Sequence, residues 1–186
     1  ATAAVVLIYT SNEVTTDFVL ADITVTDCTN AEFTGSGAVY GSTCTVSADS
    51  TPTVLVAAGA FSDAYGNTNG AASNTYTWTQ DDTGPTMTIT SDTVASGATT
   101  ATAAVVLIYT SNEVTTDFEL ADITVTDCTN AAFTGSSTVY GSTCTVTADS
   151  TPTVLVAAGT FSDASSNTNS VSNTYSWTYD GTGPTM

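Results

Sequence analysis

The chain has 186 residues, of which 41% are hydrophobic and 9% aromatic, a balance typical of a folded globular protein rather than a disordered one. It contains 18 Asp and Glu residues and no Lys, Arg or His, so its formal net charge is −18. Without cationic side chains the chain cannot neutralise phosphates, which excludes nucleic acid as a partner and disfavours an anionic membrane surface.

Short segments rich in Val, Ile, Thr, Tyr and Trp run through the chain and are separated by Gly, Asn, Asp, Ser and Pro. In chain order through the second half, the predicted strands are 85–90, 104–110, 122–128, 139–148, 152–159 and 173–180. No stretch shows helical periodicity of any length. About seven short strands in roughly 100 residues predict an all-β fold, an Ig-like sandwich of two antiparallel sheets.

The last predicted strand places its aromatic residues on one face. Tyr175, Trp177 and Tyr179 alternate with Ser176 and Thr178, which point to the other face. We therefore predict that Trp177, and Trp78 in the other half of the chain, are the large buried rings of two cores. The alternative is that these rings bind a ligand.

The chain contains an internal sequence repeat. Residues 1–66 align with residues 101–166 without a gap and differ at eight positions, so the period is about 100 residues, the size of one domain. The predicted domains are two Ig-like repeats with their linkers: 1–80 (a repeat without its first strand), 81–83 (linker), 84–179 (a full repeat) and 180–186 (linker and the start of another repeat). Because the first repeat lacks its first strand and the last residues begin another repeat, we predict that the chain is a segment of a longer tandem array.

Several motifs carry a family resemblance. They are the "TGPT" opening at 83–86, "SNEVTTDF" at 111–118, "VAAGTFSDA" at 156–164 and the closing "WTYD" at 177–180. With these motifs, each repeat resembles, end to end, the bacterial Ig-like repeats of very large surface proteins and adhesins. The resemblance implies a role as stalk, spacer or filament shaft, with calcium often bound between neighbouring domains.

Each repeat carries two cysteines, Cys28 and Cys44 in the first and Cys128 and Cys144 in the second, at the same spacing. The spacing fits neither a redox nor a zinc motif, and no His is present to complete a metal site. One disulfide within each repeat is favoured, which would imply an oxidising compartment, while free buried thiols are the alternative. Strict alternation places Cys128 on the face opposite Ile123 and Val125, so we expect either a bulge or a disulfide at a strand end.

The acidic residues suggest a metal site. In Ig strand order the linker and two loops meet at one end of the second repeat, which would bring candidate calcium ligands together: Asp81, Asp82, Glu113, Asp117 and Asp163. This is the arrangement that stiffens the linkers of cadherin-like and bacterial Ig-like arrays. The alternative is that these are solvated loop acids that maintain solubility, and no EF-hand type of calcium loop is present.

Catalysis is not expected, because the usual nucleophilic sites need a His or Lys base. We predict a non-catalytic, extracellular or cell-surface structural segment that gives length and stiffness to a filament, stalk or adhesin shaft. Its expected partners are neighbouring repeats or identical chains in a head-to-tail assembly, including a strand donated to the incomplete first domain. No hydrophobic span suggests membrane insertion. The alternative is an adhesive module that binds glycans or a surface protein through loops, for which Tyr65 is the clear aromatic candidate.

Overall fold

Short extended segments separated by turns account for almost all of the regular structure. The computed structural model describes residues 3–186, and the chain divides into two units, Ala1–Asp82 and Thr83–Met186. Each unit is an all-β sandwich, as predicted, and its helical content is limited to one 3₁₀ turn per unit in the described part of the chain: η1 (Leu20–Asp22) and η2 (Leu120–Asp122).

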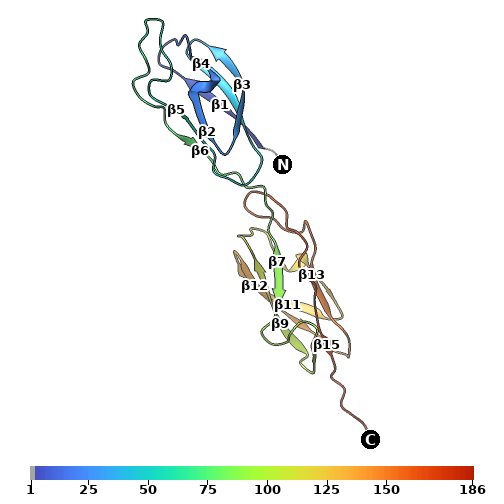
Figure 1. Cartoon of the computed structure of the whole chain (residues 1–186). Helices are drawn as coiled ribbons and strands as arrows, with labels where there is room; N and C mark the ends of the chain where they lie inside the picture. Colours follow the sequence, from blue (N-terminus) through green and yellow to red (C-terminus); the bar gives the residue numbers. More distant parts are fainter. Residues whose placement is uncertain (1–2) are drawn as a thin grey trace. The chain divides into compact units, whose positions relative to one another are not determined.

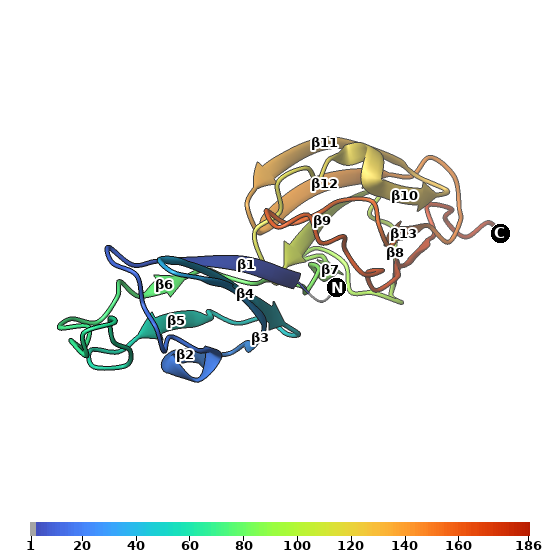
Figure 2. The same ribbon diagram turned by 90° about the horizontal axis from the view of Figure 1, so that it is seen from above.

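The first unit contains six strands among residues 3–82 (Figure 1). They are β1 (Ala3–Thr10), β2 (Ile23–Thr26), β3 (Thr29–Ser36), β4 (Val39–Val46), β5 (Thr53–Val56) and β6 (Tyr76–Thr77). One sheet has the order β1-β4-β3 and the other the order β2-β5-β6. Figure 2 shows β1 on one side of this unit and β2 and β5 on the other.

The second unit repeats this plan and adds strands. Those that repeat are β9 (Ala104–Ser111), β10 (Ile123–Thr126), β11 (Thr129–Ser136), β12 (Val139–Thr145), β13 (Thr153–Val156) and β14 (Tyr175–Ser176). The additional ones are β7 (Met87–Thr90), β8 (Thr99–Thr100) and β15 (Thr178–Tyr179). The sheet orders are β11-β12-β9-β7 and β10-β13-β14, and β15 pairs in parallel with β8.

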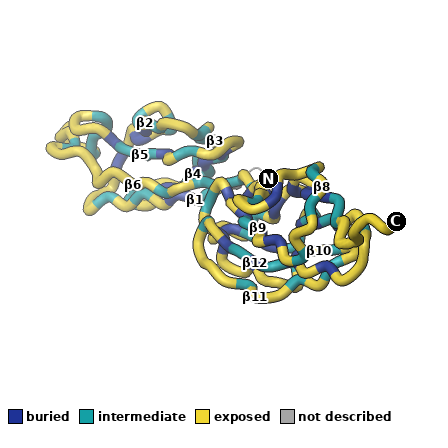
Figure 3. The backbone as a smooth tube through the Cα atoms, turned by 90° about the horizontal axis from the view of Figure 1, so that it is seen from below, coloured by how far each residue is buried: buried dark blue, intermediate teal, exposed yellow. Residues whose placement is uncertain are grey.

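Alternation along the strands builds the cores. In β4, Tyr40, Ser42, Cys44 and Val46 are buried while the residues between them are more exposed, because successive side chains of a strand point to opposite faces. Figure 3 shows such alternation of buried and more exposed positions along the strands. Ser42 is the polar residue among these buried side chains, and its hydroxyl forms a hydrogen bond of 2.9 Å with the Tyr9 hydroxyl.

Two predictions about strands need correction. The single strand expected at 173–180 is broken at Trp177, because β14 pairs with β13 in one sheet while β15 pairs with β8. The backbone N–H of Trp177 donates instead to the carbonyl oxygen of Pro152. In addition, β11 was not among the predicted strands, because its Ala, Asn and Gly residues have low strand propensity. β11 forms because it pairs along β12, across a bulge between Ala131 and Thr134.

Candidate functional site

The two acidic loops of the second unit lie side by side, as expected from Ig strand order. Thr115 forms a β-bridge with Asp163, and the backbone N–H of Thr116 donates to the carbonyl oxygen of Ser162 at 3.3 Å. The loop after β9 and the loop after β13 therefore form one surface, on which three of the predicted calcium ligands lie.

Asp117 ties these two loops together. Its carboxylate accepts the backbone N–H of Ser162 at 2.8 Å and the Ser162 hydroxyl at 2.9 Å. The first unit repeats the contact with Asp17 and Ser62, at 2.6 and 2.8 Å. There the backbone hydrogen bond from Ser62, followed by the hydroxyl hydrogen bond, lowers the pKa of Asp17. These contacts assign Asp117 and Asp17 a structural role in joining the loops.

Asp163 organises its own loop. Its side chain is only 5% exposed. One carboxylate oxygen accepts the backbone N–H groups of Ser165 and Asn167 at 2.8 and 2.9 Å, and the other accepts the Asn167 amide at 3.0 Å. Burial raises the pKa of Asp163, but the hydrogen bonds from Asn167 and Ser165 outweigh burial and hold the pKa below its ordinary value.

We expect Asp163→Asn to destabilise the second unit near neutral pH and to flatten its stability in acid. Because the folded pKa lies below the ordinary value of 3.8, the stabilisation by the ionised carboxylate is complete above that value. It is lost as the pH falls through the folded pKa. Thermal unfolding from neutral pH to about pH 2 measures this, with the difference between variant and unmodified chain as the quantity compared.

Asp92→Asn is the matched control for this substitution, because Asp92 is exposed and its carboxylate has no described partner among residues 3–186. It should leave the acid dependence unchanged. An Asp163→Asn curve that stays parallel to the unmodified chain at every pH would show that the carboxylate is not what stabilises this loop.

The five predicted calcium ligands are divided between the two units. Asp81 and Asp82 belong to the first unit, where the backbone N–H of Asp82 donates to an Asp49 carboxylate oxygen at 2.5 Å. In the second unit, carboxylate oxygens of Glu113 and Asp163 lie within 4.8 Å of each other. The Asp117 carboxylate also accepts hydrogen bonds from Ser162 of the neighbouring loop, and the Asp163 carboxylate accepts them from its own loop, so part of their capacity is already used. Calcium binding stays a prediction.

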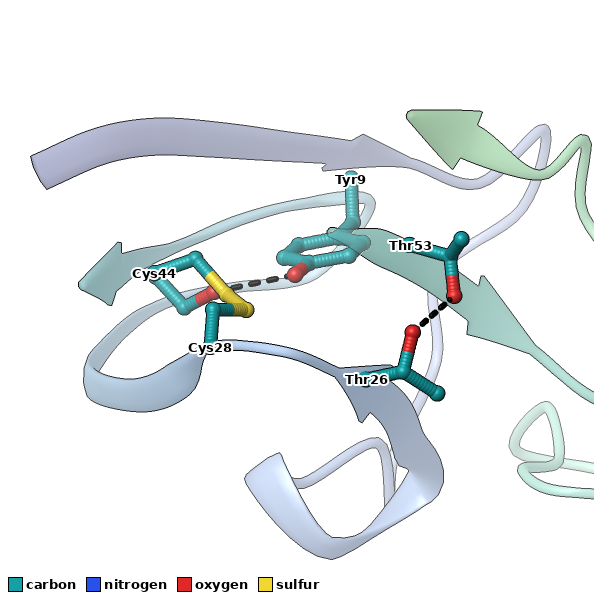
Figure 4. Close-up of a disulfide and its surroundings, with 6 residues drawn as sticks. Tyr9, Thr26, Cys28, Cys44 and Thr53 are labelled. Atoms are coloured by element: carbon teal, nitrogen blue, oxygen red, sulfur yellow. Dashed lines mark hydrogen bonds between the residues drawn. A yellow bond between two sulfur atoms is a disulfide. The ribbon is translucent and has the colours of Figure 1, made fainter. Parts of the chain in front are cut away.

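The cysteines form one disulfide within each unit, Cys28–Cys44 and Cys128–Cys144, with 5.7 Å between the Cα atoms in both. No cysteine among the described residues is free. Of the two expected arrangements, the strand end is the one observed: Cys128 lies between β10 and β11, after Asp127, whose φ of 55° turns the chain. Figure 4 shows the equivalent bond of the first unit, which joins this turn to the C-terminal part of β4.

The two tryptophans differ, which corrects the expectation that both are core rings. Trp177 is 1% exposed and packs against Tyr175, whereas Trp78 is only partly buried. The difference follows from the segment 83–100, whose Met87, Ile89 and Val94 belong to the core of the second unit.

The backbone is fixed where it enters and leaves the second unit. At the entry, the Thr86 N–H donates to the Asn112 side chain at 2.6 Å and the Ser170 N–H to the Pro85 carbonyl at 3.0 Å. At the exit, Asp149 accepts the Gly181 N–H at 2.7 Å and the Thr182 hydroxyl at 2.5 Å. Hydrogen bonds from Thr182, then Gly181, lower the pKa of Asp149. Asp49 holds the exit of the first unit in the same way, through Asp82.

Comparison with known proteins gives one family match. A family model described as a bacterial Ig-like domain matches residues 81–179. No curated protein and no solved structure matches the chain. Among the described residues, no helix has both the length and the apolar character needed to cross a membrane.

Proposed function

Since the chain belongs to the bacterial Ig-like domain family, we propose that it is a structural segment of an extracellular filament, stalk or adhesin shaft, to which it gives length and stiffness. Domains of this family are generally non-catalytic. The observation that carries the proposal is that the second unit holds its own entering and leaving backbone, at Thr86 and at Gly181. A spacer needs such fixed ends, because movement at the ends of each unit would make the array flexible.

Two further observations support this function. The near-identical sequences of residues 1–66 and 101–166 are typical of an array that repeats one module rather than of a single binding site. The disulfides favour an oxidising compartment, in agreement with an extracellular location.

An adhesive module is the second candidate, and one residue favours it. Tyr65 is 92% exposed in a loop of the first unit, and exposed tyrosines are common in protein-binding and glycan-binding surfaces. The equivalent residue of the second unit is Ser165, so the feature is not shared by both repeats. Binding of the chain to a glycan array, lost in Tyr65→Ser, would favour this candidate.

We expect arrays of this chain to lengthen in direct proportion to the number of repeats. Chains of one, two and four copies joined in the phase of the repeat, examined by small-angle X-ray scattering, provide the measurement. Rigid junctions predict a maximum dimension proportional to copy number, whereas flexible linkers predict growth with roughly its square root. Asp149→Ala should shift the scaling toward the flexible case, and Asp92→Ala should not. Square-root growth of the unmodified array would contradict the structural proposal.

The same samples test whether the chain binds calcium. Calcium that binds only the folded protein raises the melting temperature, and a chelator lowers it again. Glu113→Gln should remove this shift, because it takes away one carboxylate without a change of size. An identical melting temperature with calcium and with chelator would show the calcium prediction to be wrong.

A further inference from the structure

One asparagine of the first unit is followed by glycine, and Asn69–Gly70 is the only Asn-Gly pair in the sequence. In such a pair the backbone nitrogen of the glycine can attack the asparagine side chain with little hindrance, because glycine has no Cβ atom and its backbone rotates freely. The equivalent pair of the second unit is Asn169–Ser170. The two repeats therefore differ in reactivity at one position of the same loop, which in the first unit is the segment 57–75 between β5 and β6.

The Asn69 side chain holds this loop together. Its Oδ1 accepts the Phe61 N–H at 3.1 Å, and its Nδ2 donates to the carbonyl oxygens of Ala57 at 2.7 Å and Ala71 at 3.1 Å. Its backbone takes part as well. The Asn69 N–H donates to the Phe61 carbonyl at 2.9 Å, and the Gly59 N–H donates to the Asn69 carbonyl at 2.8 Å. The closed loop therefore depends on both the amide and the backbone of this residue.

Asn169 makes equivalent contacts in the second unit. Its Nδ2 donates to the Ala157 carbonyl at 2.7 Å, and its Oδ1 accepts the Phe161 N–H at 3.1 Å. The Asn169 N–H also donates to the Phe161 carbonyl at 3.0 Å. The asparagine thus has the same structural role in both repeats, while the residue that follows it differs.

We propose that Asn69 is a site of spontaneous deamidation, with the Gly70 backbone nitrogen as the nucleophile, and that the closed loop suppresses the reaction until it opens. The Gly70 nitrogen forms a bond to Cγ of Asn69, the bond from Cγ to Nδ2 breaks, and ammonia leaves with the proton that the Gly70 nitrogen gives up. Water then opens the cyclic succinimide at either carbonyl, which gives aspartate or isoaspartate. The only co-reactant is water.

The hydrogen bonds of Asn69 control when this reaction can occur. Nδ2 is the leaving group, so its departure breaks the bonds to Ala57 and Ala71. Oδ1 must also turn away from Phe61 as Cγ moves toward the Gly70 nitrogen. Loop opening of this kind is a local event with its own free energy, so the rate of deamidation should follow the population of the open loop.

The product cannot re-form the loop. In aspartate, a carboxylate oxygen takes the place of Nδ2 and faces the Ala57 and Ala71 carbonyl oxygens, so repulsion replaces two hydrogen bonds. In isoaspartate, the main chain is longer by one CH₂ group, which moves the carbonyl away from the position that accepts the Gly59 N–H. Deamidation is therefore an irreversible record of loop opening. It goes beyond the structural role proposed above, because it gives this repeat a chemical lifetime.

Mass spectrometry of the full chain tests the reaction, because the exchange of NH₂ for OH changes the mass of the peptide that contains it. The chain is incubated in mildly alkaline buffer, both native and denatured with reductant. Asn169 is the matched control within the same molecule. We expect Asn69 to react faster than Asn169 in the denatured chain, and Gly70→Ser to remove that difference. In the native chain the rate at Asn69 should be at least about tenfold lower than in the denatured chain.

Each of these rates can overturn one part of the proposal. Equal rates at Asn69 and Asn169 in the denatured chain would show that Gly70 does not make its neighbour reactive. Equal rates at Asn69 in the native and denatured chains would show that the closed loop does not suppress the reaction.

Asn69→Asp tests the consequence, because it places the deamidated side chain in the loop from the start. Hydrogen exchange of the segment 57–75 should become about tenfold faster or more than in the unmodified chain. Ser47→Asp adds the same charge at an exposed position outside the loop and should leave this exchange unchanged. Unchanged exchange in Asn69→Asp would show that the modified loop closes as before, and would overturn the irreversible record.

Discussion

Trp177→Ala should destabilise the second unit by about 3–5 kcal/mol, the usual range for loss of a fully buried aromatic ring. Trp177 is 1% exposed and lies in a core to which Met87, Ile89 and Val94 contribute. These residues prevent water from entering the space that alanine would leave, and the surrounding strands are paired and cannot easily close it. The expected loss is a large fraction of the stability of a domain of this size.

Trp78→Ala is the matched substitution in the first unit, and its effect should be clearly smaller. Trp78 is only partly buried, and the described part of the first unit, 3–82, has no counterpart of β7 over its core. Hydrogen exchange measures both effects in one experiment, because peptides from each unit report its own stability. Equal losses in the two units would contradict the assignment of Trp177 as a core ring that depends on the segment 83–100.

Removal of the Cys128–Cys144 disulfide should lower the stability of the second unit by about 3 kcal/mol. The bond joins residues 16 apart, and in the chain-entropy model a closed loop of this length contributes about that amount through the unfolded state. Cys128→Ala with Cys144→Ala makes the change. Since Cys144 is 0% exposed, the double variant also loses some packing, which adds to the effect.

Reduction of the unmodified chain separates these two contributions, because it breaks the bond and keeps the sulfur atoms in the core. Chemical denaturation with and without reductant gives the free energies of unfolding. We expect reduction to lower the free energy of unfolding of the second unit by most of the amount that the double variant loses. Reduction of Cys28–Cys44 should have a similar effect on the first unit. Unchanged unfolding on reduction would show that the loop is already restricted without the bond.

The sequence predicted the features that depend on local pattern. Short runs rich in Val and other apolar residues at 104–110 and 152–159 predicted two strands of the sandwich, and the eight positions at which residues 1–66 and 101–166 differ did not obscure the repeat. For the disulfide, the sequence left two possible arrangements. Strand alternation placed Cys128 on the face opposite Ile123 and Val125, but it could not decide between a bulge and a disulfide at the strand end. Asp adopts a positive φ more readily than most residues, but strand alternation alone does not place the turn at Asp127.

The features that the sequence did not predict depend on partners far along the chain. Trp78 and Trp177 occupy equivalent sequence positions but differ in burial, and Met87, Ile89 and Val94 of the segment 83–100 belong to the core that contains Trp177. β11 is likewise formed by its pairing with β12. The roles of Asp117 and Asp163 as loop ties also need the structure, because their serine and asparagine partners are common residue types that carry no motif.

The disulfide also limits how far a unit can be drawn out by force. Cys128 and Cys144 are linked directly, so the chain between them cannot extend even when the rest of the unit has unfolded. At roughly 3.4 Å per residue, about 55 Å of polypeptide is withheld from each stretching event while the bond is intact. Each oxidised repeat therefore yields a shorter step in contour length than a reduced one, and the chemistry of its surroundings sets how far the protein can be extended.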